Sequence, residues 1–295
     1  MENLAIMYHY VQPKGLKGIV PLEPDDFKNQ LEWVAKNYDI ISPDQIHLSK
    51  GLKPFCILTF DDATKDQYEI AFHILKQKGI PAYFTVMSGP LLDRKIPIVH
   101  LVHSVLSSYS DQEIWFELNT EFNLNEIDEN SKKYYFYEKD PFRRKNKYAL
   151  NFVLSEEQSR SFLERKIVAK FDDIDSFIDQ YYITLKEWLD IKVAGMTIGV
   201  HAVNHRPFSG DAQIFFNEEI EPCRSYMRTH LGIEPIWYTP AFGGGIQYTE
   251  MMNQLEPILR REGFRGGFTT QHGYINETDS FWFKRIDCVK LPPIK

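Results

Sequence analysis

One apolar run, Phe55-Cys-Ile-Leu-Thr-Phe, constrains the fold of this chain more than any other segment. It is rich in β-forming residues and has no polar face, which is typical of a strand buried on both sides of a parallel sheet. Residues 65–78 follow with apolar side chains at helical spacing, Gly79 ends that helix, and Ile80-Pro-Ala-Tyr-Phe-Thr-Val predicts another strand. Strand, helix and strand in this order predict a parallel α/β sheet or barrel.

Segments of the same character recur along the chain. Apolar runs predict further strands at residues 4–8, 39–42, 196–201, 236–240 and 264–270, and helical spacing predicts helices near 25–34, 211–230 and 248–262. Residues from about 92 to 192 break this alternation, because they are polar and carry helical windows at 157–171 and 175–189. We therefore predict one domain over residues 1–295, interrupted by a mostly helical insertion. A lid, a partner surface, a substrate-recognition element and a spacer are all open roles for this insertion.

The composition argues against several classes of protein. Hydrophobic residues make up 43% and charged residues 25% of the chain, as in ordinary soluble globular proteins. The formal net charge of -7 gives no electrostatic reason to expect nucleic-acid binding. The basic cluster Arg143, Arg144, Lys145 and Lys147 is short, so we interpret it as a solvated face rather than a membrane-surface patch. No stretch approaches about 18 consecutive apolar residues, so no transmembrane segment is expected.

The cysteines and the N-terminal residues indicate the cellular compartment of the protein. Cys56, Cys223 and Cys288 are far apart in the sequence, which favours reduced thiols over a disulfide framework or a zinc cluster of thiolates. The first residues lack the basic and apolar regions of a signal peptide. We therefore expect a cytoplasmic protein.

Three of the predicted strands end in polar residues. These ends are Thr59-Phe-Asp61-Asp62, Gly199-Val-His201-Ala-Val-Asn-His205 and Tyr238-Thr-Pro-Ala-Phe-Gly243. In parallel α/β folds and barrels the active site lies at the carboxyl ends of the strands. If the strands share a sheet, the three ends converge on one place.

Paired carboxylates and paired histidines are the signals that carry chemistry. An isolated Asp61-Asp62 pair is most simply a helix cap followed by a solvated acid, and two histidines are most simply packed separately. The His-x-x-x-His spacing of His201 and His205, however, predicts both imidazoles on one side of a helical turn. Two histidines and one aspartate make a three-ligand metal set with positions left for water and substrate. The combination predicts a metal site of Asp62, His201 and His205, with Asp61 as the catalytic base.

At these motifs the chain resembles the polysaccharide deacetylase family, also called the NodB-homology family or carbohydrate esterase family 4. Thr59-Phe-Asp-Asp matches its first motif, and His201-Ala-Val-Asn-His205 matches the second, with Ala202 in place of a hydroxyl residue. The resemblance covers residues 1–91 and 193–289. It implies an α/β fold of the deformed (β/α)7 barrel type. It also implies Asp61 as general base and Asp62, His201 and His205 as ligands of one divalent metal, zinc first, with cobalt or nickel as alternatives.

The chain departs from the family pattern at two motifs. The third motif usually reads Arg-Pro-Pro-Tyr-Gly, so Thr239 replaces the arginine that orients the base, and the resemblance suggests that Arg285 supplies the lost positive charge. It further implies that the backbone N–H of Phe242 helps to form the oxyanion hole. The family's fifth motif, Leu-x-x-His, which supplies the general acid in many members, is not found. His272 is a candidate acid or substrate contact, although an ordinary loop histidine is the simpler interpretation, and Tyr238 and Phe242 are candidate substrate contacts.

The implied reaction is metal-assisted hydrolysis of an N-acetyl group on a sugar. The absence of a signal peptide points away from chitin and peptidoglycan and towards a nucleotide sugar, a lipid-linked glycan or another acetylated precursor in surface-polysaccharide biosynthesis. Two alternatives stay open. One is a NodB-like amidase acting on a non-sugar amide, and the other is a carbohydrate-binding barrel with impaired catalysis.

Overall fold

The strand predicted at residues 55–60 is β3 (Phe55–Phe60) in the computed structural model, and it is buried along its whole length. The structure describes residues 2–14, 19–48, 53–124, 127–208, 210–242 and 248–292. β1 (Leu4–Tyr8) pairs with β3 along one edge, while β2 (Asp39–Ile40) and β4 (Tyr83–Met87) share its other edge. All three neighbours run parallel to β3, which explains why the run has no polar face.

The parallel strands of the described residues close into a barrel. The remaining strands are β5 (Thr197–Ala202), β6 (Trp237–Tyr238), β7 (Gly266–His272) and β8 (Trp282–Asp287). Their order is β1-β8-β7-β6-β5-β4-β3, and the pairing of β1 with β3 closes the ring, with β2 attached beside the start of β3. The predicted (β/α)7 barrel is confirmed, and because every strand is parallel, all the carboxyl ends lie at one rim.

The interior of the barrel changes from apolar to polar along its axis. A single buried cluster joins side chains from six strands: Ala5, Ile57, Tyr83, Trp237, Phe268 and Phe283. Thr59, Thr239 and Arg285 each follow a member of that cluster by two positions, so they point to the same interior further towards the carboxyl rim. The polar end of the interior is therefore the place for a reaction centre.

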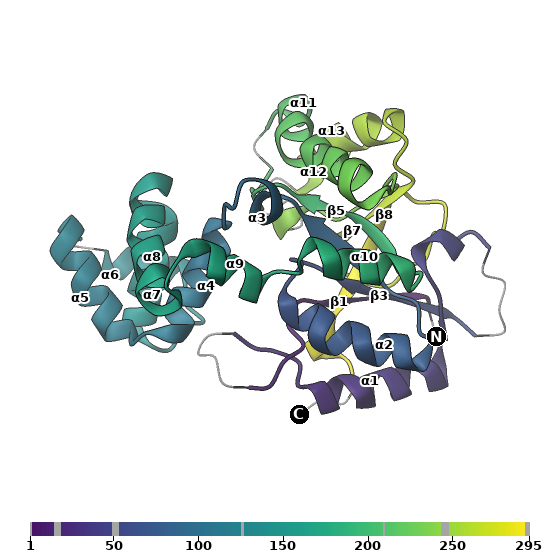
Figure 1. Cartoon of the computed structure of the whole chain (residues 1–295), viewed down its shortest axis with the longest axis horizontal. Helices are drawn as coiled ribbons and strands as arrows, with labels where there is room; N and C mark the ends of the chain where they lie inside the picture. Colours follow the sequence, from purple (N-terminus) through teal and green to yellow (C-terminus); the bar gives the residue numbers. More distant parts are fainter. Residues whose placement is uncertain are drawn as a thin grey trace. The chain divides into compact units, whose positions relative to one another are not determined.

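Helices cover the outside of the barrel (Figure 1). They are α1 (Pro24–Asn37), η2 (Gln67–Phe72), α2 (His73–Lys78), α3 (Gly89–Leu92), α10 (Leu185–Val193), α11 (Ala212–Phe215), η4 (Phe216–Ile220), α12 (Glu221–Tyr226), η5 (Met227–Leu231) and α13 (Tyr248–Arg261), with 3-10 turns η1 (Pro43–Gln45) and η7 (Cys288–Lys290). As predicted, Gly79 ends α2, with a left-handed φ of 65°. The predicted helix at 211–230 is instead divided into α and π segments, and Pro222, which has no backbone N–H, lies where η4 gives way to α12.

A second compact unit comprises residues 96–178 together with residues 19–20. Its helices are α4 (Ile98–Ser108), α5 (Asp111–Phe122), α6 (Asp128–Tyr134), α7 (Pro141–Tyr148), the π turn η3 (Ala149–Val153), α8 (Glu156–Phe171) and the first part of α9 (Ile174–Tyr181). The insertion is thus helical, as predicted. No helix among the described ranges is both long and apolar enough to cross a membrane.

The helical window at 175–189 is not one helix. It spans the end of α9 and the start of α10, because Thr184 begins a new helix through a capping box with Glu187. α10 belongs to the barrel unit, where Lys65 pairs with Glu187 at 2.7 Å and the Tyr68 hydroxyl donates to Asp190 at 2.9 Å.

Candidate metal centre and catalytic site

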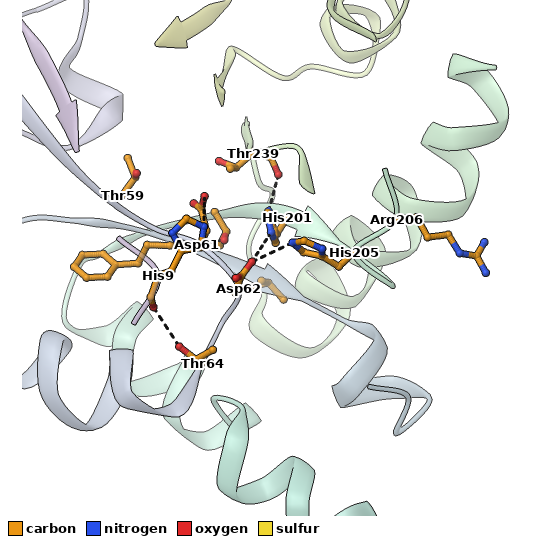
Figure 2. A network of polar contacts seen from close by, with 12 residues as sticks. His9, Thr59, Asp61, Asp62, Thr64, His201, His205, Arg206 and Thr239 are labelled. Carbon is orange, nitrogen blue, oxygen red and sulfur yellow. Dashed lines mark hydrogen bonds and ion pairs between the residues drawn. The ribbon is translucent and has the colours of Figure 1, made fainter. Parts of the chain in front are cut away.

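Asp62, His201 and His205 meet at the carboxyl rim of the barrel (Figure 2). Asp62 follows β3, His201 lies in β5, and His205 lies in the loop after β5. Nε2 of His201 is 3.0 Å and Nε2 of His205 is 3.2 Å from the same Oδ1 atom of Asp62. All three residues are buried. The structure therefore brings together the side chains that the sequence suggested as a ligand set.

The two histidines converge by a different route from the predicted one. His201 is part of a strand and His205 lies in an irregular loop, so the expected helical turn is wrong. Instead, a left-handed φ of 55° at His205 bends the loop, and Asp62 has a φ of 74°. Such backbone states cost about 1–3 kcal/mol each and persist only when the surroundings hold them. Buried Glu219 holds this loop, because its Oε2 accepts the backbone N–H of Asn204 at 2.9 Å.

The chemistry of the donor set fits a divalent cation. Nδ1 of His201 lies 2.7 Å from the carbonyl oxygen of Thr239, so this nitrogen carries the proton and Nε2 presents its lone pair to the cluster. Tetrahedral bonds of about 2.0–2.2 Å to zinc place donor atoms roughly 3.3 Å apart, close to the observed separations. Burial lowers the pKa of His201, but the hydrogen bond and charge of the Asp62 carboxylate raise it by a larger amount. The pKa of His201 is therefore above its usual value. Acid should therefore displace a bound cation.

Asp61 forms a buried, bidentate ion pair with Arg285. The guanidinium donates to Oδ1 at 2.8 Å and to Oδ2 at 2.7 Å. Arg285 is itself fixed by the carbonyl oxygen of Thr269 and the hydroxyl of Thr59, at 2.8 and 2.9 Å. Burial would raise the pKa of Asp61, but the charge and hydrogen bonds of Arg285 bring it below its usual value. Asp61 is therefore ionised at neutral pH, and Arg285 stands where the sequence suggested a replacement for the motif-three arginine.

Sequence reasoning missed His9, which follows β1 directly. Its Nε2 lies 3.9 Å from Oδ2 of Asp61, and its side chain is 38% exposed, so it faces both the carboxylate and solvent. Gln67 fixes the loop by donating to the carbonyl oxygen of His9 at 2.7 Å and to that of Asp61. The signal that could have found His9 is its position at the end of a predicted parallel strand.

Phe242 lies beside the cluster, and its ring meets the imidazole of His205 edge to face, with 4.5 Å between centroids. The residue is 45% exposed and has a left-handed φ of 54°, so it lies at the rim of the site. Gly243, the last residue of the third motif, lies outside the described residues.

Two other suggested residues are not brought into this group. The side chain of Tyr238 is fully buried, and it packs against Phe264 and Trp282 because its strand neighbours take the interior positions. His272 is exposed at the end of β7. Neither contacts the buried cluster through a described hydrogen bond or ring contact.

Comparison with known sequences gave no match: no family model matches the chain, and no curated protein does. Solved structures do match. The deacetylase PplD of Streptococcus pyogenes, solved in complex with acetate, has a TM-score of 0.58 at 18% identity, covering 99% of this chain and 94% of its own. IcaB of Ammonifex degensii has a TM-score of 0.58 at 14% identity, covering 97% of this chain and 91% of its own. A de-N-acetylase of Aggregatibacter actinomycetemcomitans has a TM-score of 0.57 at 14% identity, covering 98% and 96%.

These likenesses are low in sequence identity, and what they establish is the fold. The chain has the NodB-type barrel of the polysaccharide deacetylases, as its sequence resemblance to that family implied.

Proposed function

We propose that this protein is a metal-dependent deacetylase that removes an N-acetyl group from a sugar of a glycan or glycan precursor. One observation carries the proposal. The buried Asp62–His201–His205 set lies next to Asp61, a carboxylate that Arg285 keeps ionised. A ligand set beside an ionised base suits hydrolysis, whereas a barrel that only binds sugar needs no such base. The deacetylases that share the fold support an amide as the bond that is cleaved.

Each residue has a separate task in the proposed reaction. Asp62, His201 and His205 would hold the cation, which supplies a Lewis acid for the amide carbonyl and polarises a water molecule. Asp61 accepts a proton from the attacking water molecule as the water oxygen bonds to the carbonyl carbon. Arg285 occupies one lone pair on each oxygen of Asp61, so the orientation of the base is fixed while further lone pairs stay available. The backbone N–H of Phe242 is the proposed donor to the oxygen that gains negative charge.

We assign the general acid to His9 rather than to His272. When the C–N bond breaks, the departing amine must take a proton. His9 lies 3.9 Å from Asp61, on the same side of the site as the base, and an imidazole can donate a proton to a departing group. His272 has no described hydrogen bond or ion pair to any of these residues.

Zinc is the proposed metal, because two imidazoles and a carboxylate suit it, although cobalt and nickel bind the same donor types. The proposed substrates are nucleotide sugars or lipid-linked glycans of surface-polysaccharide biosynthesis. This substrate class and the cytoplasmic setting stay sequence-based predictions. Measuring acetate release from such precursors and from chitin oligomers tests them, and a preference for chitin oligomers would contradict them.

The substitution Asp61→Asn tests the proposed role of the base. Asparagine keeps the size of the side chain but cannot take a proton, so acetate release should fall at least about 100-fold while bound metal is retained. Asp44→Asn is a matched control, because Asp44 accepts the indole N–H of Trp237 at 2.7 Å, away from the cluster. Full activity in Asp61→Asn would remove Asp61 from the role of base, and loss of metal would place it in the ligand set. Acetate release only from non-sugar amides would favour the amidase alternative.

A further inference from the structure

The helical unit carries exposed aromatic side chains that the barrel chemistry does not use. Phe136 is 82% exposed, Tyr137 60%, Phe152 56%, Tyr134 50% and Val153 43%. We call these five residues the aromatic patch. They come from the end of α6, the loop that follows it and the turn η3. Clustered large apolar side chains in water mark surfaces that a partner covers.

The members of the aromatic patch form one surface. The ring of Tyr134 lies 4.9 Å from that of Phe152, and the ring of Phe136 lies 5.7 Å from that of Tyr137. Tyr135 joins the two pairs, with its centroid 5.9 Å from Tyr137 and 6.1 Å from Phe152. The apolar area is thus continuous rather than scattered.

The segment that carries the patch has a positive net charge. Residues 127–153 contain seven lysines and arginines against four acidic residues, a net charge of +3 in a chain whose formal charge is -7. The basic cluster that we interpreted as a solvated face is not available, because Arg143 pairs with Asp111, Arg144 and Lys145 pair with Asp128, and Lys147 pairs with Glu138. Lys133 and Lys139, which border the aromatic rings in sequence, form no ion pair within the described ranges, and Lys133 lies 6.0 Å from the ring of Tyr134.

Two hydrogen-bonding side chains beside the rings, Asn151 and Glu138, already have partners. Asn151 donates to the hydroxyl of Tyr135 at 2.9 Å, and Glu138 pairs with Lys147. A sugar-binding platform combines stacking rings with amide and carboxylate side chains that are ready for hydroxyl groups, and here Asn151 and Glu138 already bond to protein groups. In addition, the proposed reaction turns an acetamide into an amine, so the product glycan would be cationic and repelled by this surface.

We infer that the aromatic patch docks the protein onto a membrane surface that contains anionic lipids. Tyrosine, with one apolar and one polar end, suits the boundary between acyl chains and headgroups, while phenylalanine and valine suit the layer beneath. The lysines that border the patch are attracted by anionic headgroups. Binding of this kind is interfacial and needs no spanning helix. It goes beyond the proposed deacetylation, on which only the argument from a cationic product glycan rests.

Vesicle flotation with the full-length protein tests this inference. The protein should float with vesicles of phosphatidylcholine and phosphatidylglycerol, bind vesicles of phosphatidylcholine alone much more weakly, and dissociate as salt is raised. Phe136→Ser/Tyr137→Ser should weaken binding at least about tenfold, because both side chains lose their apolar contact with the membrane. Lys133→Glu/Lys139→Glu should weaken vesicle binding at least about 20-fold, because each lysine near an anionic surface raises the affinity roughly fivefold.

Matched controls use equally exposed residues elsewhere. Val193 is 86% exposed on α10, and Lys78 and Lys186 are exposed on α2 and α10, so Val193→Ser and Lys78→Glu/Lys186→Glu should leave vesicle binding unchanged. Every variant should keep the thermal unfolding midpoint and the acetate release from a small soluble substrate.

Four results would overturn the inference. They are the absence of binding to anionic vesicles, equal binding by the patch variants, loss of glycan binding without loss of vesicle binding, and a concentration-dependent self-association that the patch variants abolish. The third result would make the patch a glycan platform, and the fourth would make it an interface between copies of this chain.

Discussion

Replacing Arg285 with glutamine tests whether its guanidinium holds Asp61 ionised inside the barrel. Arg285 donates to both carboxylate oxygens of Asp61, to the hydroxyl of Thr59 and to the carbonyl oxygen of Thr269. Glutamine carries no charge, so the variant leaves a buried carboxylate without a cation. Removing one partner of a buried ion pair costs about 3–5 kcal/mol, and we expect a loss of this size in the free energy of unfolding near neutral pH.

This loss should shrink as the pH falls. In the wild type, burial raises the pKa of Asp61, but Arg285 lowers it by a larger amount. The ionised carboxylate therefore stabilises the folded state at pH values above the unfolded pKa of about 3.9. In Arg285→Gln the effect of burial is opposed only by the smaller effects of His9 and His201, so the folded pKa of Asp61 should rise above the unfolded one. The carboxyl group then destabilises the variant at neutral pH and becomes harmless once it is protonated. The difference in stability between the two proteins should therefore be largest near neutral pH and smaller near about pH 4.

Urea unfolding of the chelator-treated proteins at the two pH values measures the difference. Arg265→Gln is the matched control. Because Arg265 is exposed, this variant should unfold like the wild type at both pH values. A loss in Arg285→Gln that is the same at both pH values, or below about 1 kcal/mol near neutral pH, would refute the reasoning.

Three further predictions concern other parts of the molecule. His9→Gln should lower acetate release about 100-fold without changing bound metal, and an unchanged rate would return the general acid to an unassigned residue. Glu219→Gln should weaken zinc binding about 10- to 100-fold in a titration, because the carboxylate that holds the loop before His205 is lost. Phe268→Ala should lower the free energy of unfolding by about 3–5 kcal/mol, because Phe268 is fully buried in the barrel interior, and a loss below about 1 kcal/mol would contradict that packing.

The barrel could be predicted because its strands are buried on both faces. Such strands read as continuous apolar runs, and β3 was recognised on that basis. The carboxyl ends of parallel strands share one rim, so polar residues at the ends of β3 and β5 could be grouped from the sequence. The convergence of Asp62, His201 and His205 could be predicted from the sequence for that reason.

Features that depend on local backbone geometry or on partners distant in the chain could not be predicted from the sequence. The bend at His205 comes from a left-handed φ held by Glu219, and a sequence spacing cannot distinguish it from a helical turn. The side chain of Tyr238 points away from the interior because of strand register, which a strand of two residues does not reveal. The resemblance suggested the role of Arg285, but only the structure gives its two hydrogen bonds to Asp61.

Calorimetric titration of the chelator-treated protein with Zn²⁺ examines the claim on which the proposed chemistry depends. We expect one zinc site per chain, binding at least about 100-fold weaker in His205→Ala, and nearly unchanged binding in Asp61→Asn. Zinc bound equally well by His205→Ala, or no zinc site in the wild type, would contradict a metal centre of Asp62, His201 and His205.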